Sequence, residues 1–241
     1  MNLLILRPDD LTAPGKASVY QDDRRFKHLS SVLKADSGKL LKVGLLDGEI
    51  GSASITSATS EKFDLEFTLG LKPPAPLPVK LILALPRPKV VLRALQSATS
   101  LGVKEIYLLN AFKVEKAFWS CEQLASVSIE KSLLLGLEQA RDTLMPKVHL
   151  KKRFKPFVED ELSALSENSN RVVAHPTSEA TRLGLLEGPQ TIVIGPEGGF
   201  IPYEIEMLQA HGFKAVNLGP RILKSETAMI SVLSRIQITY P

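Results

Sequence analysis

The sequence is poor in the residues that build disulfides, metal centres and membrane spans. It has one cysteine, Cys121, and four histidines among 241 residues. A single cysteine excludes a disulfide within the chain and any thiolate metal cluster supplied by this chain alone. No uncharged apolar run reaches the roughly 18 residues of a membrane helix, and Arg7 and Pro8 interrupt the first apolar segment before it could serve as a signal peptide. We therefore expect a cytoplasmic protein with no membrane partner and no metal.

Several common catalytic fingerprints are also missing. The sequence contains no G-x-G-x-x-G, G-x-x-x-x-G-K-[ST], H-E-x-x-H, G-x-S-x-G or C-x-x-C. These motifs bind dinucleotides or phosphates, hold zinc, or present a nucleophile. Their absence argues against dinucleotide oxidoreductases, P-loop phosphoryl transferases, zinc enzymes and serine hydrolases.

The chain changes its pattern once, at a proline-rich segment. Residues 1–72 show short strand-like runs around one helical stretch at about 22–33, and Asp47-Gly48 is a strong hairpin signal. Residues 73–78 hold four prolines in six positions and predict a semi-rigid linker. From 79 to 241, short apolar runs alternate with helical patterns, which predicts a parallel sheet with helices on both faces. The sequence thus predicts an α/β domain preceded by a small β-barrel.

Positive charge is in excess and clustered. The net charge is +4, with a pI of about 9.1. Clustered Lys and Arg side chains neutralise nucleic-acid phosphates. Runs of this kind also occur as solvated protein surface, so the alternative is no partner at all. The candidate RNA contacts in the first 72 residues are Arg24, Arg25, Lys27 and Lys34.

Two segments near the C-terminus, 191–200 and 216–228, share one pattern. Each begins as an apolar run, breaks at Gly-Pro and continues into a helical stretch. Ligands bind at the carboxyl ends of strands in open α/β sheets. Glycines 195, 198 and 199 let a flat ligand approach the backbone without meeting a Cβ. The pair predicts a cleft for an adenosine-like ligand, although Gly-Pro turns can also simply end two strands.

The same segments resemble the signature of a known family. Ile194–Phe200 (IGPEGGF) and Leu218–Ala228 (LGPRILKSETA) are similar to the motifs of SPOUT-class methyltransferases that methylate N3 of a uridine in 16S ribosomal RNA, the RsmE family. The likeness spans nearly the whole chain. It extends to residues 28–34, 100–103, 138–141 and 174–176.

The resemblance implies a fold, a cofactor and partners. It implies a C-terminal trefoil knot, an N-terminal PUA-like RNA-binding barrel, a homodimer, S-adenosylmethionine as methyl donor, and ribosomal RNA or the small ribosomal subunit as substrate. The family usually has Arg where Lys34 and Lys224 stand, and we add Lys224 to the candidate RNA contacts. The implied cofactor-binding residues are Ala174, His175, Pro176, Gly195, Pro196, Glu197, Gly198, Gly199, Leu218, Gly219, Ile222, Leu223 and Thr227.

Two side chains are the candidates for catalysis. Methylating an imide N3–H requires proton removal, stabilisation of the resulting negative charge, and alignment with the donor. Glu226 is the candidate proton acceptor or substrate-orienting group; its alternative role is that of a carboxylate at a helix N-terminus. Arg221 is the candidate for binding a phosphate or the developing charge. The sequence leaves open a different target base or ribose, and a non-catalytic RNA-binding or ribosome-assembly factor.

Overall fold

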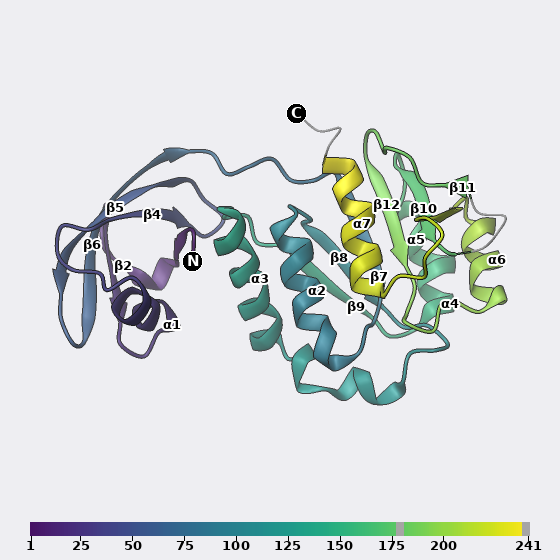
Figure 1. The fold of residues 1–241 in the computed structure, drawn as a ribbon, viewed down its shortest axis with the longest axis horizontal. Helices are drawn as coiled ribbons and strands as arrows, with labels where there is room; N and C mark the ends of the chain where they lie inside the picture. The colour runs from purple at the N-terminus through teal and green to yellow at the C-terminus, as the bar shows by residue number, and fades with distance from the viewer. Residues whose placement is uncertain (177–180, 238–241) are drawn as a thin grey trace. The chain divides into compact units, whose positions relative to one another are not determined.

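A computed structural model describes residues 1–176 and 181–237, and their contacts form two compact units. The first unit comprises residues 1–75 together with 134–145, and the second comprises 76–133 together with the chain from 146 onward. Residues 72–78 between β6 and β7 carry no regular structure, as their prolines require. Figure 1 labels the elements along the chain.

The first unit contains a curled six-stranded sheet in the order β1-β4-β5-β6-β3-β2. β1 pairs with β4 in parallel, and the other pairs are antiparallel. β1 and β2 lie at opposite ends of this order, so a closed barrel stays a prediction. The strands are β1 (Leu4–Leu6), β2 (Leu11–Ala13), β3 (Lys16–Tyr20), β4 (Leu40–Leu45), β5 (Ile50–Ala58) and β6 (Lys62–Leu71).

One helical segment packs on this sheet, where the sequence predicts it. α1 (Arg24–Lys27) begins after Asp23, whose side chain accepts the Arg25 backbone N–H and caps the helix. It continues as one wider turn, η2 (His28–Val32), in which the Leu33 N–H bonds the His28 carbonyl. Leu29 is fully buried in the core with Phe63 and Leu65 of β6.

A second apolar cluster in this unit combines residues far apart in the sequence. Leu134 and Leu137, from the last part of α3 (Ser126–Ala140), pack with Leu3 and Ile5. The helix begins at Ser126. The short helical turns η3 (Lys116–Ser120) and η4 (Glu122–Leu124) precede it.

The second unit is built on a seven-stranded sheet in the order β11-β13-β10-β12-β7-β8-β9, in which all pairs are parallel. Consecutive residues Leu81, Ile82 and Leu83 of β7 are all at most 1% exposed, as in a strand covered on both faces. The strands are β7 (Val79–Ala84), β8 (Glu105–Leu109), β9 (Lys147–Lys151), β10 (Asn170–Ala174), β11 (Thr181–Arg182), β12 (Gln190–Ile194) and β13 (Lys214–Asn217).

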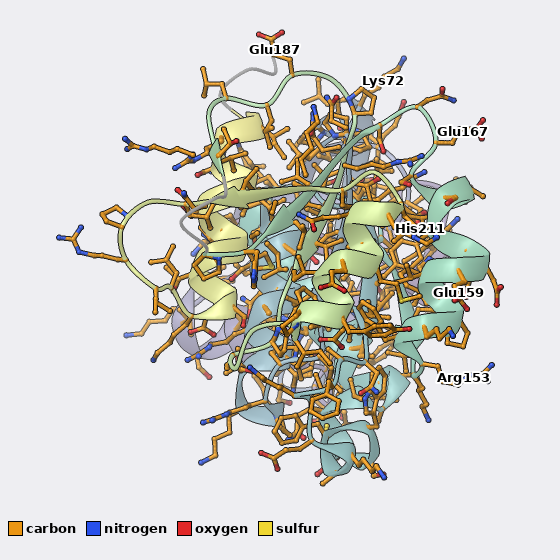
Figure 2. All side chains as sticks on the ribbon, turned by 90° about the vertical axis from the view of Figure 1, so that its right-hand side faces the viewer. Lys72, Arg153, Glu159, Glu167, Glu187 and His211 are labelled. Atoms are coloured by element: carbon orange, nitrogen blue, oxygen red, sulfur yellow. The ribbon has the colours of Figure 1, made fainter. Side chains whose placement is uncertain are left out.

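Helices cover both faces of this sheet. Figures 1 and 2 show α2 (Pro88–Ser100) and α7 (Ser225–Gln237) on one face and α6 (Pro202–Ala210) on the other, with α4 (Phe154–Pro156), η5 (Phe157–Glu161) and α5 (Leu162–Leu165) beside it. Glu159, labelled in Figure 2, lies on the outer side of that second layer. Among the described residues, no helix is long and apolar enough to span a bilayer. The parallel α/β architecture predicted for this part is confirmed.

The order of the strands decides where a site can form. β13, β10 and β12 are neighbours and run in the same direction. Their carboxyl ends therefore meet at one edge of the sheet, and the three loops that follow them converge there.

Candidate functional site

The three loops enclose one cavity of about 280 Å³, which we call the three-loop cavity. Its walls come from the ends of β10, β12 and β13, the loops after them and the start of α7. The volume is close to the lower end of the range of small-molecule sites. The lining residues are Ala174, His175, Pro176, Ile194, Gly195, Pro196, Glu197, Gly198, Gly199, Phe200, Val216, Asn217, Leu218, Gly219, Arg221, Ile222, Leu223, Ser225 and Ala228.

Two glycines leave the backbone open to the cavity. Gly199 has a φ of +70° and Gly219 a φ of +127°, conformations that other residues rarely adopt. A Cβ built on either glycine would meet no atom within 4 Å. The backbone at these two glycines thus borders free space, so a ligand can come close to the peptide groups there.

The loop after β12 is held from outside the cavity. Gly198 lies under Lys113, whose Nζ donates a 2.7 Å hydrogen bond to the Gly198 carbonyl. Glu197 accepts the backbone N–H of Arg87 at 3.2 Å and so ties the loop to the start of α2. These bonds keep the loop in place before any ligand arrives, which lowers the entropic cost of binding.

His175 connects two of the loops. Its backbone N–H bonds the Val216 carbonyl at 2.9 Å, which joins the end of β10 to β13. Burial of the imidazole lowers the pKa of His175 below its ordinary value of 6.5. The ring is therefore neutral at pH 7 and adds no positive charge to the wall.

The cavity gathers nearly every residue that the sequence assigns to the cofactor. Only Thr227 of that set lies outside the lining; it is exposed on α7, so it is not among the residues that face the cavity. Six further lining residues were not assigned from the sequence, although all of them lie within segments 191–200 and 216–228. They are Ile194, Phe200, Val216, Asn217, Ser225 and Ala228.

The two candidate catalytic residues differ in position. Arg221 lines the cavity. Glu226 stands in the first turn of α7, outside the lining, and its carboxylate accepts two hydrogen bonds from Nη2 of Arg93, at 3.1 and 3.3 Å. The structure thus gives Glu226 the ion pair and helix position of its alternative, structural role.

One expected RNA contact needs correction. Arg25 is 5% exposed, and its guanidinium bonds both carboxylate oxygens of Asp10, those of Asp23 and the backbone oxygen of Ile5. These bonds satisfy the charge inside the first unit, so Arg25 serves the fold and is not available to a phosphate.

The other expected RNA contacts differ in how free they are. Arg24 makes a bidentate pair with the buried Glu138, at 2.9 and 2.5 Å, and its side chain is 32% exposed. Lys27, Lys34 and Lys224 are exposed. Within the parts of the chain that the structure describes, no group of three His, Cys, Asp or Glu side chains is arranged to hold a metal ion.

Comparison with known proteins identifies the family. Residues 73–237 match the model of an RNA methyltransferase domain. A ribosomal RNA small subunit methyltransferase E of Treponema pallidum (strain Nichols) is 30% identical over 233 residues, covering 95% of this chain and 87% of the relative. The chain belongs to this methyltransferase E family. Another member, from Mesomycoplasma hyopneumoniae (strain 232), is 30% identical over 159 residues, covering 65% of this chain and 68% of its own.

A solved structure of the methyltransferase E family has the same fold. The protein from Neisseria gonorrhoeae, crystallised with S-adenosyl methionine, superposes with a TM-score of 0.76 at 21% identity and covers 100% of this chain and 98% of its own. At this identity the comparison establishes the architecture of the chain. The resemblance expected from the IGPEGGF and LGPRILKSETA segments is confirmed at the level of the family.

Proposed function

We propose that this protein transfers the methyl group of S-adenosylmethionine to N3 of a uridine in 16S ribosomal RNA. The observation that carries the proposal is the three-loop cavity, formed by the segments that resemble the RsmE signature in a chain that belongs to the methyltransferase E family. Both its size and its glycine-rich backbone suit the donor.

The lining residues match the chemistry of the proposed donor. Leu218, Ile222 and Leu223 offer aliphatic surface to an adenine ring, while open backbone at Gly199 and Gly219 offers N–H and C=O groups to its polar edge. When bound, S-adenosylmethionine supplies an electrophilic methyl group, so that the N3–CH₃ bond forms as the S–CH₃ bond breaks and the N3 proton leaves to a base. Residues of this chain must orient the uracil and balance its charge.

Arg221 and Glu226 are the side chains proposed for those tasks. Arg221 lines the cavity and offers a guanidinium to the negative charge that develops on the uracil oxygens. Glu226 is the proposed proton acceptor. To act so, its carboxylate must leave the pair with Arg93. Glu226 directly follows Ser225, which is the first residue of α7 and part of the cavity lining.

The remaining parts of the proposal concern assembly. We propose that residues 1–72 form a PUA-like RNA-binding barrel in which Lys27 and Lys34 contact phosphates, and that residues 79–241 form a SPOUT domain with a C-terminal trefoil knot. The exposed Lys224 is proposed to add a further RNA contact. A homodimer and a cytoplasmic location stay predictions; light scattering during size-exclusion chromatography tests the dimer.

Two measurements test the function. Calorimetry on the purified protein should show S-adenosylmethionine and S-adenosylhomocysteine binding with micromolar dissociation constants; no heat with either ligand would refute the proposed cofactor.

Mass spectrometry of nucleosides should show that N3-methyluridine disappears from 16S ribosomal RNA when the gene is deleted and returns with the wild-type gene. Loss of another methylated nucleoside would move the target to a different base or ribose. RNA binding without any methyl transfer would favour an assembly factor.

A further inference from the structure

A second hollow adjoins the three-loop cavity, and we call it the arginine hollow. It has a volume of about 420 Å³ and shares part of its wall with the cavity, including Arg221 and Ile222. Ligands in the two spaces would therefore contact some of the same residues. The lining residues are Pro176, Arg182, Asn217, Gly219, Pro220, Arg221 and Ile222.

All the charge in this lining is positive. Arg182 and Arg221 are its only charged residues, both are exposed, and neither has an ion-pair partner among the residues that the structure describes. Arg93 and Lys151 of the same unit, by contrast, pair with Glu226 and Glu161. Two unpaired guanidinium groups beside one concave surface are suited to a ligand that carries phosphate.

The structure also explains why Arg182 stands there. It ends β11, a two-residue strand that pairs with β13 and sets Arg182 opposite Asn217. The next residue, Leu183, donates its backbone N–H to the Asn217 carbonyl at 2.9 Å. Two backbone pairings thus fix Arg182 beside the loop that carries Arg221.

Apolar groups in the same hollow offer a surface to a base. Ile222 is 88% exposed although it is a large aliphatic residue, and Pro176 and Pro220 lie in the same lining. Together these three residues give the hollow an apolar surface beside its two positive charges. Unstacked bases in RNA are recognised by face contacts of this kind together with contacts to phosphate.

We propose that the arginine hollow holds the nucleotide that is methylated, with Arg182 binding its phosphate and Ile222 lying against its base. Arg221 borders both spaces and so stands near the reacting base, whereas Arg182 borders only the hollow and is assigned to the phosphate. The inference rests on the proposed methyl transfer and adds the substrate side of the site. A single-stranded or flipped-out nucleotide is the chemical class that fits.

The experiment compares Arg182→Ala, Arg182→Lys and a matched control. Lys214→Ala removes one exposed positive charge from the first residue of β13, outside both linings. The substrates are small ribosomal subunits and protein-free 16S ribosomal RNA from cells lacking the gene, and the one that the wild-type protein methylates is used. Methyl transfer gives kcat and KM for RNA, and calorimetry gives the dissociation constant of S-adenosylmethionine.

Arg182→Ala should raise KM for RNA about 10- to 100-fold, the effect of losing a charge-assisted hydrogen bond, with cofactor affinity within about twofold of wild type. The slope of log KM against log salt should fall by about one. Arg182→Lys should recover part of the loss, because it restores the charge without the paired N–H groups. Lys214→Ala should behave as wild type.

Three results would overturn the assignment: an unchanged KM in Arg182→Ala, a parallel loss of cofactor affinity, or an equal effect of Lys214→Ala. Failure of the proposed function looks different, because wild-type protein would then bind no S-adenosylmethionine or methylate neither substrate.

Discussion

Arg25 is predicted from the sequence to contact RNA, whereas the structure indicates that it stabilises the first unit, and a substitution can distinguish the two roles. The sequence places it in a basic cluster that suits RNA, but its guanidinium is enclosed by Asp10, Asp23 and the Ile5 carbonyl. The change to test is Arg25→Met, which keeps the apolar stem and removes the charge. We expect a large loss of stability and no specific loss of RNA affinity.

The size of the effect follows from the partners that the variant leaves behind. Arg25 makes hydrogen bonds of 2.6 and 2.8 Å to Asp10 and of 2.9 and 2.6 Å to Asp23, and its side chain is 6% exposed. Removing one partner of a buried ion pair costs about 3 to 5 kcal/mol. Burial alone would raise the pKa of Asp23, but its bonds to Arg25 lower that pKa below 3.8. The stabilisation by Asp23 is therefore present above pH 3.8 and is lost as the pH falls further.

Urea unfolding at neutral pH, followed by circular dichroism, measures the loss. With a slope of about 1.5 kcal/mol per molar, a loss of 3 kcal/mol lowers the midpoint by about 2 M. The single tryptophan, Trp119, lies in the second unit, so its fluorescence distinguishes a local from a global loss. Lys27→Ala, an exposed charge on the same helix, is the control and should change stability by less than about 0.5 kcal/mol. A loss below about 1 kcal/mol for Arg25→Met, or reduced RNA affinity in a folded variant, would refute the reasoning.

Three further changes probe the three-loop cavity and the first turn of α7 next to it in the sequence. Gly199→Val should lower S-adenosylmethionine affinity at least tenfold in calorimetry, because its side chain enters the ligand space. Gly38→Val, at a similar φ of +85° in open surroundings, should leave that affinity unchanged; equal losses would contradict the assignment. Burial lowers the pKa of His175 in the folded protein. As the pH falls below 6.5, the His175 imidazole therefore binds a proton in the unfolded chain before it does so in the folded protein. Stability should therefore fall less steeply from pH 7 to 5 in His175→Gln than in the wild type. The same change of urea midpoint with pH in both proteins would contradict this. If Glu226 is the base, Glu226→Gln should lose about 100-fold or more in turnover and keep cofactor affinity, while Arg93→Ala keeps turnover; near-normal turnover in both would leave Glu226 a structural role.

Much of the second unit could be predicted from local pattern. β8 (Glu105–Leu109) is an example, because a short apolar run between a Gly-ended helix and a polar loop has few alternatives. Two loops of the cavity could be predicted because segments 191–200 and 216–228 each break at Gly-Pro where such a run stops. The third loop, at residues 174–176, followed from the family resemblance, and the strand order β13-β10-β12 that brings the three loops together comes from the structure.

Features that depend on distant partners could not be predicted in this way. Nothing near Arg25 in the sequence shows that Asp10 and the Ile5 carbonyl surround it in the folded unit. β11 has two residues and exists because β13 pairs with it, so no periodicity signals it. Arg182 was missed for the same reason: its relation to Arg221 arises from that pairing.

The division of α3 between the two units affects how the protein folds during synthesis and how it can be divided into fragments. The first unit borrows residues 134–145, which supply Leu134 and Leu137 to its apolar cluster and Glu138 to Arg24. During synthesis it cannot complete its packing until that helix has left the ribosome, although its own strands emerge about 70 residues earlier. A fragment that ends at the proline linker would lack those contacts. To study the first unit by itself, residues 134–145 must be supplied as well, either by circular permutation of the chain or as an added peptide.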